Sequence, residues 1–380
     1  MIENLQELLA NIVFGRTLNQ NVNLVSKYDF IGGCSLLTSL IKSFKTEMGV
    51  KRMVQNHSSS LISLGWNLLN DVRERSPTMD DKILASIAIR HFTRTLKEYF
   101  RQLVDVEAWE VFQKICRAES GSLFDLMSRI LLEPASQDGI SIFYPVGIED
   151  IESNMNKSKA TLINLFLHFV NAKYVLKVFK PDPRKPEESK EAFMTVTMKI
   201  IESAHLLAKS MPKEDSCQAC LVSAINYMAK CSSVNEFYPI FEKTYRVLLV
   251  DLILPHLVLT EQEREDFERN EVEYFSYSVD LVNPGAKNSE TPKARAAKLL
   301  DNLCTSIDGC LTYVSQILFG LVDVVSQQLD LQAALAAYPI LAEVLGSELF
   351  KKVGKMDILD MSLLTMAIIS EKILARTDLR

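Results

Sequence analysis

Apolar positions recur every three or four residues along most of the chain. Between Asp81 and Phe92, for example, Leu84, Ile87 and Ala88 share one face of a 3.6-residue period. This spacing is typical of amphipathic helices that pack one face into a core. The pattern predicts helices at about 2–14, 29–48, 51–74, 80–101, 106–117, 121–132, 149–179, 187–210, 215–230, 234–257, 261–277, 292–305, 308–328, 331–344 and 356–375.

The helices come in pairs that short breaks separate. The breaks at 209–215 and 231–234 are examples, and successive pairs recur at about forty residues, the period of HEAT units. Each pair combines an amphipathic helix with a nearly all-apolar one, as expected when the apolar helix lies between neighbouring repeats. We therefore predict an all-α, HEAT-like helical-repeat solenoid, a right-handed α-α superhelix. It would run as one continuous array over residues 1–380, either complete or as part of a longer array. Three predicted loops interrupt it without dividing it: 133–146, 181–186 and 282–291.

Composition supports long helices and argues against two classes of partner. The chain has 13 glycines and 12 prolines in 380 residues, and 48% of its residues are hydrophobic. A formal net charge of −6 disfavours direct binding of nucleic acid. The longest uncharged stretches, 309–322 and 331–342, are too short for a membrane span, so no membrane insertion is expected.

The cysteines point to packing and not to metal or redox chemistry. They are an odd set without a secretory leader, which favours reduced thiols and a location in the cytoplasm and nucleus. Cys217 and Cys220 form a lone Cys-x-x-Cys pair on a predicted helix, and no second ligand pair follows at zinc-site spacing. We expect both to be small apolar core residues. The seven positions are 34, 116, 217, 220, 231, 304 and 310.

The chain offers little that favours an enzyme. His168 lies in the apolar run 165–170, His205 has similar surroundings, and neither has a nucleophile or acid in a triad-like context. Gly32 and Gly33 stand alone and do not form a phosphate-binding loop. We therefore expect a protein that is not an enzyme, with no catalytic residue, no cofactor and no metal. An unrecognised helical active site is the alternative.

One segment, 260–291, is unusual because acids dominate its first half; we call it the acidic segment. Between 261 and 273 it has seven acidic and two basic residues, a local charge of −5. Thr260 and Glu263 have the spacing of a capping box, which predicts a helix start. Most charge runs are solvated helix faces. A partner-binding surface is the alternative interpretation.

The residues around the acidic segment follow a known pattern. Ile253–Leu257 ends an apolar helix with a hydrophobic-Pro step, and 265–270 and Glu273-Tyr274 follow. The stretch 292–304 then reads PKARAAKLLDNLC. On these residues, the tract 245–306 resembles the importin-β (karyopherin) superfamily of nuclear transport receptors. It is most similar to the exportin that recycles importin-α and to the larger importins. One departure is Phe275-Ser276, where the family has an Ile-Arg step.

The resemblance implies a receptor that wraps its partners on a concave, acidic face. Expected partners are protein cargo with basic segments, the GTPase Ran and Phe-Gly nucleoporins. Family chains run to more than twice this length, and residues 1–240 carry no clear match to the opening helices of the family's Ran-binding block. The alternative is a scaffold subunit of a larger assembly, favoured if the acidic helix pairs with Lys293, Arg295 or Lys298 of the same chain. The candidate partner contacts are Glu261, Glu263, Glu265, Asp266 and Glu268.

Overall fold

The computed structural model of the chain separates into two compact units, 1–227 and 228–380. Each is described by itself below. The predicted helices at 2–14, 51–74 and 106–117, and most of that at 261–277, lie outside the described residues. The structure describes residues 27–43, 79–105, 123–132, 149–170, 188–211, 215–258, 263, 265, 269–270, 291–326, 331–345, 358, 360–366 and 368–369.

Every regular element in these ranges is helical, so the prediction of an all-α helical-repeat fold is confirmed. No helix in the described ranges is both long enough and apolar enough to cross a bilayer. The two units divide inside helix α10, after Tyr227. One continuous array over residues 1–380 stays a prediction.

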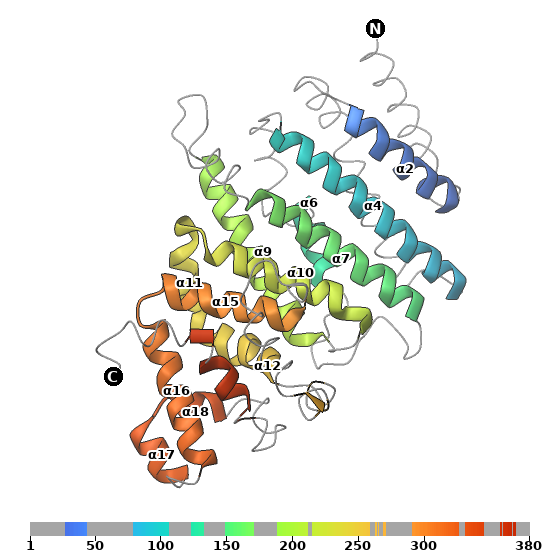
Figure 1. Ribbon diagram of the computed structural model, residues 1–380. Coiled ribbons are helices and arrows are strands. Elements are labelled where there is room, and N and C mark those ends of the chain that lie inside the picture. Colours follow the sequence, from blue (N-terminus) through green and yellow to red (C-terminus); the bar gives the residue numbers. More distant parts are fainter. Residues whose placement is uncertain are drawn as a thin grey trace. The chain divides into compact units, whose positions relative to one another are not determined.

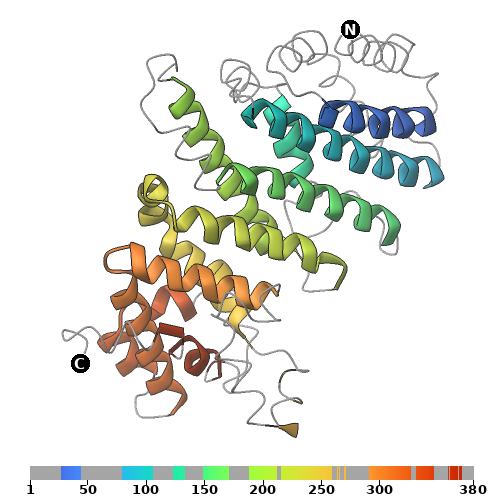
Figure 2. The same cartoon turned by 45° about the horizontal axis from the view of Figure 1, so that its top comes forward.

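The first unit is built from long helices that pack side by side (Figure 1). In it α4 packs against both α2 and α7, while α6 packs against α7 and α9. Figure 2 shows α2, α4 and α7 as neighbours in chain order. The helices are α2 (Lys27–Ser43), α4 (Met79–Asp105), α6 (Leu123–Leu132), α7 (Glu149–Phe169), α9 (Glu188–Ser210) and α10 (Asp215–Ser232), whose last residues belong to the second unit.

Polar contacts fix the direction of neighbouring helices in this unit. The hydroxyl oxygens of Thr38 and Thr95 lie 3.0 Å apart, and Lys42 approaches Glu98 at 3.9 Å. Since the residue numbers increase together on both helices, α2 and α4 run parallel. Parallel neighbours need a return segment between them, which is the geometry of stacked helix pairs.

The same parallel relation joins α7 to α10. Asn156 donates to the Cys217 sulfur at 3.5 Å, and Asn164 donates to the Ser223 hydroxyl at 3.4 Å. The predicted repeat of about forty residues between successive helix pairs is too short here, because α7 starts at residue 149 and α10 at residue 215. The reason is the length of α7 and α9, which have 21 and 23 residues, and of the connection between them.

The core of the first unit follows the predicted apolar stripes. Phe92 and Leu96 of α4 and Leu162 of α7 are fully buried. Tyr99 is also buried, at 1% exposure, and burial raises the pKa of its phenol well above the ordinary value. The buried residues of α4 repeat at intervals of three, four and seven. Of the stripe predicted at 84, 87 and 88, Ala88 is fully buried, whereas Leu84 and Ile87 are half-buried.

The second unit contains shorter helices. The structure corrects the single helix predicted at 234–257, which consists of four successive elements. Pro255 explains one of them, because it has no N–H and its ring would clash with the carbonyl four residues earlier. The wider π turn η3 accommodates it, with the Leu254 N–H bonded to the Leu249 carbonyl. The elements are η2 (Asn235–Phe237), α11 (Tyr238–Leu248), η3 (Leu249–Ile253), α12 (Leu254–Leu257), α15 (Pro292–Ser306), α16 (Cys310–Val325), α17 (Leu331–Ala337) and α18 (Leu341–Leu345).

The helix predicted at 331–344 is also divided in two, because Pro339 ends the periodic stretch. A turn closes between α17 and α18, where the Leu341 N–H donates to the Tyr338 carbonyl at 2.9 Å. This turn brings Leu341 against Gly320 of α16, where a side chain would not fit: a Cβ on Gly320 would lie 2.6 Å from a Leu341 methyl. The small residue therefore lets α16 and α18 approach closely.

Candidate partner-binding site at the acidic segment

Two packed helices hold the ends of the acidic segment. Before it, α12 ends at the buried Leu257, and Val258 turns the backbone to an extended conformation. After it, the Thr291 hydroxyl caps α15 by accepting from the Ala294 N–H at 3.1 Å, with Pro292 in the first turn. Because α12 packs against α15, the segment leaves and rejoins the unit at neighbouring places.

An ion pair ties the acidic segment to the first turn of α15. The Lys293 ammonium donates to both carboxylate oxygens of Glu263, at 2.5 and 2.6 Å. The two side chains are only 9% and 19% exposed. Burial lowers the pKa of Lys293, and the Glu263 carboxylate opposes that shift. Glu263 is thus engaged inside the chain.

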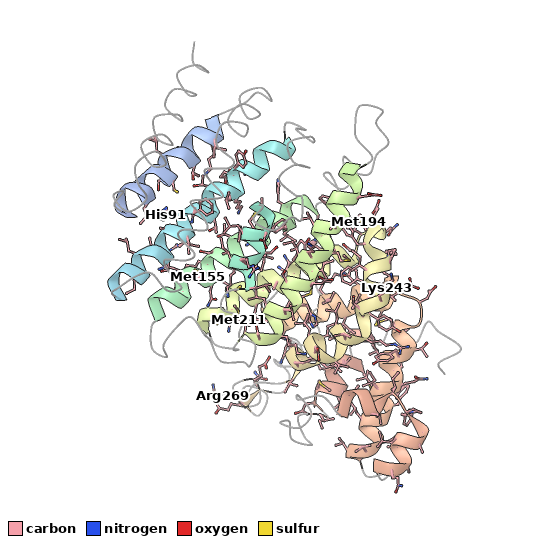
Figure 3. All side chains as sticks on the ribbon, turned by 180° about the vertical axis from the view of Figure 1, so that it is seen from behind. His91, Met155, Met194, Met211, Lys243 and Arg269 are labelled. Carbon is pink, nitrogen blue, oxygen red and sulfur yellow. The ribbon has the colours of Figure 1, made fainter. Side chains whose placement is uncertain are left out.

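The other candidate acids have different positions. Glu265 is exposed to solvent and available to a partner. The remaining three, Glu261, Asp266 and Glu268, lie outside the described residues. Arg269, labelled in Figure 3, and Asn270 are exposed further along the segment.

The three cations named above as possible internal partners of the acids make different contacts. Lys293 binds Glu263 across thirty residues of chain, whereas Lys298 binds Asp301 within α15 at 2.8 Å. The Arg295 backbone N–H continues the first turn by donating to the Thr291 carbonyl at 3.1 Å. One of the predicted internal pairings is therefore present.

An aromatic contact stiffens the helices beside this site. The rings of Tyr245 in α11 and Tyr313 in α16 meet edge to face, 5.6 Å apart. The exposed Arg246 guanidinium covers the Tyr313 ring at 5.1 Å. Asn302 of α15 donates to the Ala229 carbonyl at 2.7 Å, and this hydrogen bond links α15 to the end of α10.

The Cys-x-x-Cys pair is packed in the core. Cys217 and Cys220 are buried free thiols, and Asn156 donates to the Cys217 sulfur. Burial raises the pKa of Cys220 to about 12, so its thiol stays protonated at neutral pH. Among the residues that the structure describes, no three His, Cys, Asp or Glu side chains gather as metal ligands would.

Sequence reasoning missed a row of cations on α4, which we call the basic ladder: Arg90, Arg94 and Lys97. Intervals of four and three residues place them within about 60° on one helix face. The signal was present in the sequence RHFTRTLK. The acidic net charge of the whole chain, −6, conceals such a local basic cluster.

Comparisons with known proteins add no family. No protein-family model matches the chain, and no curated protein matches it. Among solved structures, the crystal structure of an engineered protein is similar at 13% identity over 95% of this chain and 99% of that one. Its TM-score of 0.18 is too low to bear on fold or function.

Proposed function

We propose that the chain is a nuclear transport receptor of the karyopherin type that binds basic protein cargo at the acidic segment. Ran and Phe-Gly nucleoporins belong to the proposed partners, and the cytoplasm and nucleus to the proposed locations. The proposal rests on the resemblance of the tract 245–306. The helical-repeat fold supports it, because stacked helix pairs present long surfaces to protein partners.

The observation that carries the proposal is how the acidic segment is fixed. Glu263 is held by Lys293 at the start of α15, while Glu265, two residues on, is exposed. An anchored segment loses less conformational freedom on binding than a free one, so the exposed Glu265 carboxylate can attract a basic partner at a lower entropic cost.

The competing function is a scaffold subunit without a transport role. The Glu263–Lys293 pair favours it, because part of the acidic charge is neutralised inside the chain. The two functions share the acidic segment and differ in their response to Ran. A transport receptor couples cargo binding to Ran-GTP, whereas a scaffold has no reason to do so.

A cargo-displacement assay separates the two functions. The chain would be loaded with a fluorescein-labelled lysine-rich peptide at low salt, and Ran-GTP or Ran-GDP would be added. A receptor predicts that Ran-GTP changes peptide affinity and that Ran-GDP does not. Peptide binding that is indifferent to both forms would favour the scaffold. Absence of peptide binding would refute the cargo site in either version.

A further inference from the structure

We propose that the basic ladder on α4 is a second interaction surface, which binds an acidic peptide segment of a partner protein. The ladder belongs to the first unit and does not depend on the function proposed above. Its chemistry is the opposite of the acidic segment's, so it would recognise a different partner.

The geometry of the ladder favours recognition of several carboxylates together. Arg90 and Lys97 are seven residues apart, which corresponds to about 10 Å along the helix. Arg94 lies between them and is exposed, and Lys157 of the neighbouring helix α7 is exposed as well. Lys157 follows Asn154, a direct partner of Arg90, by one turn. Consecutive acidic side chains of an extended peptide could meet several of these cations.

Among the acids whose side chains the structure describes, none forms an ion pair with the ladder. Glu98, the acid of this part of α4, approaches Lys42 of α2 at 3.9 Å. Like charges four residues apart on a helix repel one another, so the ladder is unfavourable without counter-charge. An arrangement of this kind gains when an anionic partner binds.

The contacts of Arg90 give the strongest support for a carboxylate ligand at the ladder. One guanidinium nitrogen, Nη1, donates to the side-chain oxygen of Asn154 at 3.4 Å, and Asn154 also donates to the Ser86 hydroxyl. These contacts orient the guanidinium. Its Nε is buried and has no hydrogen-bond partner. A buried donor without an acceptor is costly, and a carboxylate is the acceptor that an arginine fork fits best.

Burial and neighbouring cations lower the pKa of two groups at the ladder. The pKa of Arg90 is lowered by partial burial and by Arg94. The pKa of His91, labelled in Figure 3, is lowered by burial and then by Arg94 and Arg90. Burial is the larger cause of both shifts, and the neighbouring guanidinium groups add to it in the same direction.

A protein segment fits this surface better than a nucleic acid does. The ladder is short, and the chain as a whole carries a net charge of −6, which repels a long phosphate backbone. A peptide with a few acidic residues provides local charge complementarity without that repulsion.

Fluorescence anisotropy of the full chain tests the proposal, with a labelled peptide of alternating glutamate and serine as the probe. Its matched control is the same peptide with glutamine at each glutamate. We expect binding of the acidic peptide at low salt that weakens as salt is added. Arg94→Gln and Lys97→Gln should each weaken it about threefold, as exposed charge pairs do. Arg90→Gln should weaken it about tenfold, because its guanidinium is partly buried.

Lys243→Gln is the control variant, since Lys243 is an exposed cation on α11 in the second unit (Figure 3). It should leave peptide affinity unchanged. Circular dichroism verifies that each variant is folded. If Arg90→Gln is not, the Arg94→Gln/Lys97→Gln double variant decides alone, because Arg94 is exposed and Lys97 half-buried.

Three results would overturn the proposal. One is no binding of the acidic peptide at low salt, and another is an equal loss in Lys243→Gln. The third is a single-stranded oligonucleotide that binds more tightly than the peptide and loses affinity in the ladder variants, since the site would then recognise phosphates.

Discussion

At the scale of single residues, two cations of the chain differ in the partners that they contact. The Lys293 ammonium is nearly buried, and its position is tenable because the Glu263 carboxylate accepts two hydrogen bonds from it. The Arg90 guanidinium donates to an amide oxygen, that of Asn154, and no carboxylate among the described side chains contacts it. Lys293 therefore has a carboxylate partner inside the chain, whereas the Arg90 guanidinium can still donate hydrogen bonds to an acidic partner.

Removing the Glu263 carboxylate should expose the cost of burying Lys293. Glu263→Gln leaves a buried ammonium without its counter-charge, so we expect a loss of about 2–3 kcal/mol in the free energy of unfolding. Lys293→Met leaves the Glu263 carboxylate without its counter-charge, but that side chain is more exposed than Lys293, 19% against 9%, so the loss should be smaller, about 1–2 kcal/mol. Urea unfolding of both single variants and the double variant measures this. No coupling between the two positions in this double-mutant cycle would contradict a buried pair.

The Glu263–Lys293 pair also makes the stability of the folded chain depend on pH in alkaline solution. Because burial lowers the pKa of Lys293 in the folded chain, the folded state releases this proton at a lower pH than the unfolded state. Its contribution to stability should therefore rise with pH through the lowered pKa, up to the ordinary lysine value. The rise should be larger in Glu263→Gln, which lacks the opposing carboxylate, and absent in Lys293→Met. Unfolding curves at several alkaline pH values test the order of the three proteins.

Buried thiols should resist labelling in the native chain. Burial raises the pKa of Cys34 and of Cys220 to about 12, so neither forms thiolate at pH 9, where an unfolded cysteine largely does. Iodoacetamide at pH 9, followed by peptide mass spectrometry, should modify both only after denaturation. Rapid native labelling of Cys220 would show that the thiol is accessible. By the same linkage, their contribution to stability falls as pH rises from the ordinary thiol pKa toward 12.

At the scale of elements, the sequence predicts helix positions well where the apolar periodicity and the residues that start or end helices agree. The predictions 187–210 and 292–305 match α9 and α15 closely, because an apolar stripe ends at Ser210 in one and Pro292 opens the other. The stretch predicted at 234–257 is helical over 235–257 but contains a π turn before Pro255, and the one predicted at 331–344 is interrupted at Pro339. A proline inside an apolar run reveals an interruption, but whether it produces a π turn or a break depends on the packing around it.

The candidate site could be predicted only in part, because the sequence shows which residues are neighbours along the chain but not which distant residues pair. The acids of the segment are local features, so their cluster is visible in the sequence. The pairing of Glu263 with Lys293 spans thirty residues, and Lys298 and Arg295 were equally good partners by charge. Only the direction of the first turn of α15 selects Lys293. The basic ladder was missed although its spacing is local, because the net charge concealed it.

Close contact between helices α16 and α18 should make Gly320 sensitive to substitution. A Cβ there would lie 2.6 Å from the Cδ1 atom of Leu341, which is fully buried and has little room to shift. Gly320→Ala should therefore cost about 1–3 kcal/mol of unfolding free energy. Gly309→Ala is the comparison: nothing lies near its Cβ, and only the positive φ of 79° opposes it, at about 1–2 kcal/mol. Gly309→Asn should relieve part of the second loss and Gly320→Asn none of the first, as chemical unfolding would show.

At the scale of the whole molecule, two units carry opposite local charge on a chain of net charge −6. The first presents the basic ladder on α4, and the second holds the acidic segment between α12 and α15. A helical-repeat protein offers surface in place of a pocket, so partner choice depends on where such charges lie. The two proposed interaction sites therefore differ in the sign of their charge.

The most direct test of this account is calorimetric titration of a lysine-rich peptide into the full chain at low salt. Glu265→Gln should weaken binding about two- to fivefold, as expected for one exposed carboxylate. Glu242→Gln, which removes an exposed acid of α11 in the same unit, should leave it unchanged. Simultaneous replacement of Glu261, Glu265, Asp266 and Glu268 by their amides should abolish it. Undiminished binding by that last variant would contradict the claim that the acidic segment receives the partner.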